Sequence, residues 1–168
     1  MRIKWLQLLM LAVSMSTLPV LALAKEMPDL DLKLRVEKRV VLSNAEGETR
    51  TEWREVKSLK PGDMLKYTIM YTNTSTTEAR DAVIVDSVPF RSAYVSSSAK
   101  GKNTEITFSL DGKEFQSPAL LKYKAKSPDT QEQELLATPE MYTHIRWQIT
   151  KPVPTGGSGK VSFKAILK

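Results

Sequence analysis

The chain has 168 residues, with 25 Lys and Arg against 19 Asp and Glu, and a formal net charge of +6 at pH 7. It has no cysteine, which excludes a disulfide framework and a lipoprotein acylated at a cysteine. No motif combines basic and aromatic residues as nucleic-acid-binding modules do, so nucleic acid is not expected as a partner. The fold must therefore rest on a hydrophobic core, for which this length is sufficient.

The first 24 residues have the three parts of a secretory signal peptide. Arg2 and Lys4 give a positive start, residues 5–13 are mostly apolar, and Ala22-Leu23-Ala24 is an A-x-A cleavage site. The apolar run is shorter than the roughly 20 residues that span a bilayer. We therefore expect residues 1–24 to be a signal peptide that is cleaved after Ala24.

Cleavage leaves residues 25–168 as a single domain. Its net charge is +4, because 23 basic and 19 acidic residues remain. This mild charge fits a solvated surface or attraction to anionic envelope polymers or lipids. No second long apolar run follows, so we expect no transmembrane anchor after cleavage and a periplasmic or extracellular location, including the cell surface.

Alternation of apolar and polar residues predicts strands in the first half of the mature chain. Residues 30–42 carry apolar side chains on every even position except Lys38 and are predicted to form a half-buried strand. The charged segment 48–57 suits an edge strand. Residues 65–72 alternate again, and the apolar run 82–85 indicates a core strand that ends by Pro89.

The second half continues in the same way. Residues 127–139 are predicted to be a loop, with a short helical turn possible at 131–136. In the strand that begins at Thr143, Trp147 alternates with polar residues and is predicted to face the core. Strands are predicted at residues 93–98, 104–110, 115–124, 143–150 and 160–167. About eight or nine short strands with frequent turns and no long amphipathic helix predict an all-β, antiparallel β-sandwich.

Several segments also follow one another in a recognisable order: Leu59–Asp63 (LKPGD), Tyr67–Thr74, Val83–Pro89 (VIVDSVP), Tyr94–Ala99, His144–Trp147 and Gly157–Phe163. Together they resemble the DUF11 conserved repeat domain, present here in a single copy over residues 59–168. The resemblance implies an immunoglobulin-like sandwich and a prokaryotic cell-envelope setting, and it implies no catalytic residue. The residues expected to define the fold are Pro61, Gly62, Asp63, Tyr67, Asp86, Pro89, Trp147 and Phe163.

Candidate catalytic and metal-binding residues are few. His144 is the single histidine, so a zinc site is hard to assemble, and no G-x-S-x-G motif supplies a nucleophile for it. Asp63, Asp81, Asp86 and Asp111 do not form a calcium loop and are expected to accept hydrogen bonds at turns and strand ends. We expect no catalytic residue, no metal, no cofactor and no enzymatic activity.

Lys122, Lys124 and Lys126 recur at every second residue and share one face of a strand. They either protect an edge strand or form a contact stripe for an anionic partner, and Trp53 with Tyr71 is a candidate platform for sugar. The sequence predicts a non-catalytic exported envelope protein that acts by binding or structural contact with an envelope protein or anionic polymer. A carbohydrate-binding module and an accessory component of a pilus or secretion assembly are the alternatives.

Overall fold

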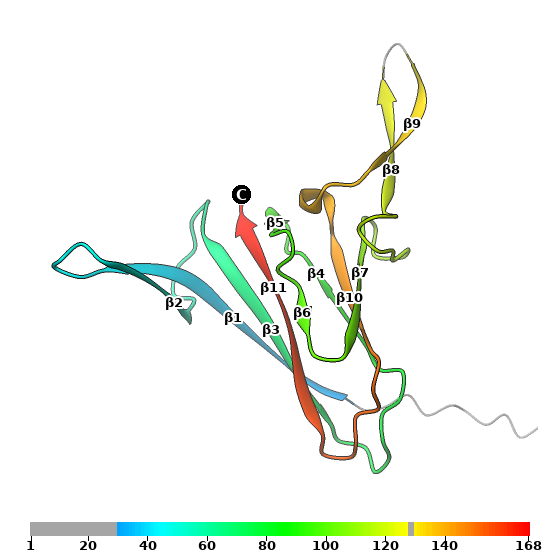
Figure 1. Ribbon diagram of the computed structural model, residues 1–168, viewed down its shortest axis with the longest axis horizontal. Coiled ribbons are helices and arrows are strands. Elements are labelled where there is room, and N and C mark those ends of the chain that lie inside the picture. The colour runs from blue at the N-terminus through cyan, green and yellow to red at the C-terminus, as the bar shows by residue number, and fades with distance from the viewer. Residues whose placement is uncertain (1–29, 128–129) are drawn as a thin grey trace, which may run out of the picture.

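A computed structural model describes residues 30–127 and 130–168, and the expected signal peptide and its cleavage site lie outside them. The described part contains eleven strands and one short 3-10 helix (Figure 1). In chain order these are β1 (Leu30–Ser43), β2 (Thr49–Glu55), β3 (Met64–Asn73), β4 (Val83–Ser87), β5 (Ser92–Tyr94), β6 (Lys100–Gly101), β7 (Thr104–Ser109), β8 (Lys122–Ser127), β9 (Thr130–Leu136), η1 (Pro139–Met141), β10 (His144–Ile149) and β11 (Ser158–Leu167).

The strands form two antiparallel sheets and a separate hairpin. The larger sheet has the order β2-β1-β3-β11-β5, with β6 also paired to β11, and the smaller sheet has the order β4-β10-β7. The two sheets pack face to face, which confirms the predicted all-β, antiparallel sandwich. The end of the β1–β2 hairpin and the whole β8–β9 hairpin project away from the sandwich as two arms (Figure 1).

Aromatic rings at the centre of the core join the two sheets. Phe163 of β11 is fully buried, and its ring lies 4.8 Å from that of Tyr67 on β3 and 6.2 Å from that of Trp147 on β10. Ile145 and Ile149 flank Trp147 on the same face of β10 and are also buried. This is the orientation that the alternation in the sequence predicts.

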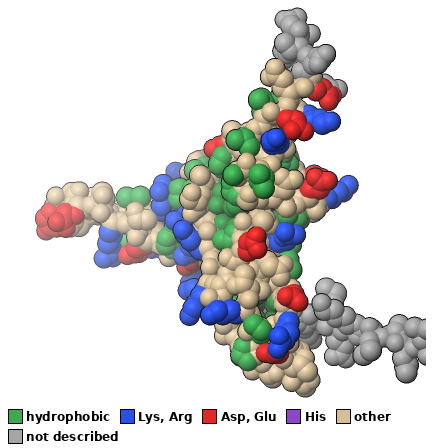
Figure 2. Space-filling model, turned by 45° about the vertical axis from the view of Figure 1, so that its right-hand side comes forward, with side chains coloured by type: hydrophobic (Ala, Val, Ile, Leu, Met, Phe, Trp, Pro, Cys, Tyr) green, Lys and Arg blue, Asp and Glu red, His purple; other side chains and the backbone are tan. Residues whose placement is uncertain are grey.

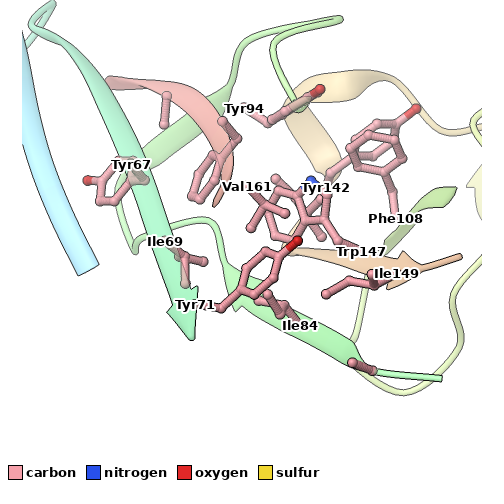
Figure 3. Packing of buried hydrophobic residues seen from close by; sticks show 14 of the residues in the cluster. Tyr67, Ile69, Tyr71, Ile84, Tyr94, Phe108, Tyr142, Trp147, Ile149 and Val161 are labelled. Carbon is pink, nitrogen blue, oxygen red and sulfur yellow. The ribbon is translucent and has the colours of Figure 1, made fainter. Parts of the chain in front are cut away.

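A second aromatic cluster closes the side of the sandwich next to β7. Tyr94 of β5, Phe108 of β7 and Tyr142 after η1 have ring centroids 4.7 to 5.7 Å apart (Figure 3). The Tyr94 hydroxyl accepts a hydrogen bond from the Ala99 N–H at 3.0 Å. The cluster thereby ties the chain that follows β5 to the smaller sheet.

A turn at residues 60–63 fastens β3 to the end of β11. Gly62 has a φ of +88°, which only glycine adopts without strain, and its N–H donates to the Leu167 carbonyl. The Asp63 carboxylate accepts the Lys60 N–H at 2.8 Å and pairs with the Lys38 ammonium at 2.7 Å. The hydrogen bond from Lys38, more than any other contact, lowers the pKa of Asp63.

Two predicted segments in the second half differ from the structure. The strand predicted at residues 115–124 begins at Lys122, because residues 117–121 form a turn closed by the Ser117 carbonyl. The predicted loop at 127–139 contains β9, and the helical turn lies at Pro139–Met141 instead of residues 131–136. Since β9 belongs to a projecting hairpin and is mostly polar, it lacks the alternation by which strands are recognised.

The chain between β5 and β7 also departs from expectation. The strand predicted at residues 93–98 ends at Tyr94, where the chain enters a turn in which Ser97 has a φ of 56° and the Ser98 N–H bonds to the Val95 carbonyl. The short strand β6 then follows on the edge of β11. Together β6 and β9 account for the strands that the sequence did not predict.

Burial differs from prediction along one side of the sandwich. The run 82–85 was predicted to be a core strand, but β4 is an edge strand in which Val83 and Val85 are 46% and 48% exposed while Ile84 is buried. On β1 the apolar face is only partly covered, since Leu32 and Leu34 are 51% and 58% exposed. The physical reason is that the smaller sheet has too few strands to cover β1.

We predict that Trp147→Ala lowers the free energy of unfolding by about 3–5 kcal/mol, because it empties the contact between the two sheets. Phe90→Ala is a matched control, since Phe90 is 93% exposed and its truncation should leave the melting curve nearly unchanged. Denaturant titration of both variants measures the difference. Equal stability of the two variants would contradict the placement of Trp147.

The Asp63–Lys38 ion pair should make the folding stability depend on pH. The pKa of Asp63 is lowered in the folded chain. The ionised Asp63 therefore stabilises the fold at a pH above its unfolded pKa of about 3.9, and this stabilisation is lost as the pH falls through the lower pKa of the folded chain. Asp63→Asn should therefore reduce stability at pH 7 and flatten the decline below about pH 4. Asp31→Asn, which removes an exposed ion pair with Lys33, should change stability little. Chemical unfolding between pH 2 and pH 7 tests both.

Candidate binding surfaces

A groove of about 680 Å³ lies at one end of the sandwich, between the β6–β7 turn and the connector that joins β10 to β11. Lys100, Lys102, Lys151 and Lys160 line it, and no acidic residue does. None of the four forms an ion pair with another described side chain. We call this site the lysine groove. Its positive charge is not balanced locally, which favours an anionic ligand.

The floor and rim of the lysine groove suit close contact with a ligand. Ile149, Val153 and Tyr71 contribute apolar surface, and burial raises the pKa of the Tyr71 hydroxyl. Gly159 lies directly against the Tyr71 ring, so that a Cβ atom at this position would collide with it. Because Gly159 has no side chain, the Tyr71 ring can pack directly against the backbone of β11.

Asn73 holds the rim of the lysine groove in place. Its side chain is fully buried and donates to the Thr77 and Val153 carbonyls at 2.8 and 2.9 Å, while its amide oxygen accepts from Ser75. Its backbone exchanges hydrogen bonds with Gly156 and Gly157 at 2.9 Å. One residue therefore ties the β3–β4 loop and the β10–β11 connector into a single unit.

The opposite wall is fixed by the β6–β7 turn. Asn103 adopts a φ of 52°, a conformation that asparagine tolerates better than most residues. Its carbonyl accepts hydrogen bonds from both the backbone N–H and the hydroxyl of Thr150, at 2.8 and 3.0 Å. The turn that carries Lys102 is thus anchored to the end of β10.

The outer face of the larger sheet carries further basic side chains next to the lysine groove. Figure 2 shows Lys and Arg side chains gathered on the flank from which the β1–β2 arm projects. Here most charges are already matched: Glu37 is buried and pairs with Lys66 at 2.6 Å and with Arg35 at 3.3 Å. The ring of Trp53 covers the ammonium groups of Lys66 and Lys164. This face is therefore less available to an anion than the groove.

The predicted contact stripe lies on the projecting β8–β9 hairpin (Figure 1). Lys122 and Lys124 pair with Glu134 and Glu132 of β9 at 3.4 and 3.7 Å. The side chain of Lys126 lies outside the part of the chain that the structure describes. The paired carboxylates reduce the positive potential that the sequence suggested for this stripe.

The other residues singled out from the sequence do not gather into one site. Trp53 lies on the outer face of the larger sheet, whereas Tyr71 is buried on its core face, so the two form no common platform. His144 contacts the Thr143 hydroxyl at 2.9 Å. Asp111 accepts the N–H groups of residues 113 and 114, which lower its pKa, and Asp86 accepts the next N–H along the chain.

The lysine groove was not predicted from the sequence. Lys100, Lys102, Lys151 and Lys160 come from two stretches about fifty residues apart in the chain, and neither stretch is conspicuously basic. The pairing of β6 with β11 and of β7 with β10 brings them together. A useful signal would have been the turn residues around them, since loops at one end of a sandwich lie close in space.

Among the described residues, no three His, Asp or Glu side chains are grouped so that they could hold a metal ion. Within the same residues there is no helix with the length and apolar character needed to cross a membrane. Comparison of the chain with protein-family models, curated proteins and solved structures found no match.

We predict that Asn73→Ala loosens the rim of the lysine groove. The substitution removes one donor from each of the Thr77 and Val153 carbonyls, which keep their bonds from the Ser75 hydroxyl and the Ala79 N–H, at a cost of about 0.5–1.5 kcal/mol for each lost hydrogen bond. Amide hydrogen exchange at Gly156 and Gly157 should accelerate. Ser75→Ala is the control, because it removes one hydroxyl while the Asn73 side chain keeps its bonds to the two carbonyls. Similar exchange in both variants would argue against this role for Asn73.

Proposed function

We propose that this chain is a non-catalytic protein of the cell envelope that binds an anionic envelope polymer through the lysine groove. The observation that carries the proposal is the set of unpaired ammonium groups of Lys100, Lys102, Lys151 and Lys160 around one groove that lacks any acidic lining residue. Binding of this kind requires complementary charge and a firm frame, and needs no catalytic group.

The envelope location is part of the proposal and rests on the sequence. Residues 1–24 have the pattern of a secretory signal, and segments over residues 59–168 resemble the DUF11 conserved repeat domain. An immunoglobulin-like sandwich without cysteine is compatible with a binding module of that setting. We propose that the mature chain works in the periplasm or at the cell surface.

The side chains of the lysine groove favour binding of an anionic polymer over stacking of aromatic rings on a sugar. Carbohydrate modules present exposed aromatic faces, whereas Tyr71 is only 7% exposed and Trp53 covers two ammonium groups. A polymer of phosphate or carboxylate groups would meet the lysines one after another along the open groove. The apolar floor would contact the backbone of the polymer between its charged groups.

The proposal predicts salt-sensitive binding that depends on the groove and not on the β8–β9 hairpin. We choose linear polyphosphate as the probe and compare Lys100→Gln/Lys102→Gln/Lys160→Gln with Lys122→Gln/Lys124→Gln/Lys126→Gln. Both triple variants lose the same charge. The groove variant should lose roughly tenfold in affinity, as three exposed charge contacts of about 0.5 kcal/mol each would give, and the hairpin variant should bind like the parent.

Calorimetric titration at increasing salt measures both effects. Affinity of the parent should fall between 0.1 M and 1 M salt, because the screening length falls from about 10 Å to about 3 Å. Equal losses in the two triple variants would indicate a response to net charge alone, and a loss confined to the hairpin variant would assign contact to the lysine stripe. Either result would contradict the groove as the binding site.

A further inference from the structure

The outer edge of β4 has backbone groups that no neighbouring strand uses. β4 pairs only with β10, and the Val88 N–H just after it donates to the Thr143 carbonyl at 2.8 Å. In an antiparallel ladder, alternate residues bond to a given neighbour. The even positions of β4 therefore face β10, and the N–H and C=O groups of Val83 and Val85 point away from it, toward the open edge.

Beside this edge lies an apolar surface that nothing covers among the described residues. Leu32 and Leu34 of β1 pair with Tyr71 and Ile69 of β3, so they share the core face of the larger sheet. Their partners on β3 are buried, yet the two leucines are 51% and 58% exposed. At the level of these leucines, the larger sheet thus extends by one strand, β1, beyond the smaller sheet.

The stacking order of the two sheets places the open edge of β4 opposite β1. Trp147 on β10 packs against Phe163 on β11. Burial raises the pKa of Tyr67 on β3, and the charge of Asp86 on β4 adds to that rise. Figure 3 shows Ile84 of β4 next to Tyr71 of β3. The next position in the smaller sheet, beyond β4, therefore faces β1, and no described strand occupies it.

A single carboxylate marks one end of this vacant position. Asp86 is half-buried on the core face of β4 and accepts a hydrogen bond from the Ser87 N–H at 2.8 Å. It forms no ion pair with a described residue. Burial raises its pKa, against the opposing effects of that N–H and of His144. A cationic side chain arriving beside it would supply the missing counter-charge.

We propose that the edge of β4 binds an extended segment of another exported protein as an additional antiparallel strand. The segment carries apolar side chains at alternate positions, which cover Leu32 and Leu34, and a Lys or Arg opposite Asp86. Its backbone bonds to the free groups of Val83 and Val85. Such strand addition obtains affinity from main-chain hydrogen bonds and specificity from side chains that enter pockets at every second position.

A second copy of this chain fits the vacant position poorly. The open edge strand β2 carries Arg50, Glu52 and Arg54 on the face that continues the core face of β1, and burying this charged group is costly even though Glu52 pairs with both arginines. The proposed strand-binding site is also separate from the lysine groove. It is therefore an additional interaction surface and does not depend on the anion binding proposed above.

The test uses a fluorescein-labelled peptide, acetyl-Lys-Thr-Ile-Thr-Val-Thr-amide, titrated with the purified protein and followed by anisotropy. Opposite β4, its Lys, Ile and Val would face Asp86, Ile84 and Ala82. Saturable binding is expected, with a loss of at least about tenfold when the peptide lysine is replaced by glutamate, since one attractive charge contact becomes repulsive. Failure of the parent protein to bind the peptide, or equal affinity for both peptides, would overturn the proposal.

Two pairs of variants identify the surface. Val85→Pro removes an N–H that faces the open edge and leaves the bonds to β10 intact, so it should abolish peptide binding, whereas Val85→Thr should retain it. Leu34→Gln should weaken binding, while Val41→Gln, at a site 60% exposed near the end of the same strand, should not. Melting curves establish that each variant is folded.

Peptide binding unchanged by Val85→Pro would overturn the proposal even if the peptide binds. Sedimentation of the parent protein tests whether a second copy of this chain occupies the open edge of β4 instead. Self-association that disappears with Val85→Pro would assign the edge to a second copy of this chain and likewise overturn it. Because Lys100, Lys102 and Lys160 are not part of this surface, their substitution should leave peptide affinity unchanged, so failure of one proposal is distinguishable from failure of the other.

Discussion

The contact of Phe163 with Tyr67 and Trp147 is the interaction on which the rest of the structure depends. It joins the middle strands of two sheets that differ in width, because the larger sheet has six strands and the smaller has three. Packing at the centre fixes the sheets face to face, so the strands of the larger sheet that have no counterpart in the smaller sheet must extend past its edge. These strands are β1, which presents a partly uncovered apolar face, and β2, which belongs to the charged arm.

The lysine groove depends on the same frame in a different way. It is built from the turn after β6 and the connector before β11, both at one end of the sandwich, and Asn73 and Asn103 hold them by hydrogen bonds to buried carbonyls and to β10. A groove with firm walls loses little conformational freedom when a ligand binds. Loops on a rigid sandwich are a common place for binding surfaces.

Sequence periodicity identified most of the strands because their two faces meet different environments. It located β1, β3, β10 and β11 closely, and it placed Trp147 on the buried face. It failed at β9, where both faces of a projecting hairpin meet solvent and the residues are mostly polar. The turn at residues 117–121 was missed for a related reason, since apolar side chains such as Leu121 made it look like the interior of a strand.

The candidate binding surfaces were less accessible to sequence reasoning than the fold. Alternation in β1 indicates which face is apolar, but it carries no information on how many strands the opposing sheet has. Leu32 and Leu34 therefore looked like core residues. Likewise, Lys122, Lys124 and Lys126 attracted notice because they are close in sequence, whereas Lys100 and Lys151 are brought together only by strand pairing over a long separation. Glu132 and Glu134, which pair with the lysine stripe, fell in a segment read as loop.

The two projecting hairpins have a consequence for how the molecule moves in solution. They extend from the sandwich in different directions (Figure 1), so the hydrodynamic radius of the chain is larger than that of a sphere of equal mass. Its frictional ratio should exceed that of a compact domain, and its apparent mass in gel filtration should exceed the true mass of the monomer. Rotational diffusion would then be anisotropic, with backbone amides in the arms and in the sandwich relaxing differently according to their orientation.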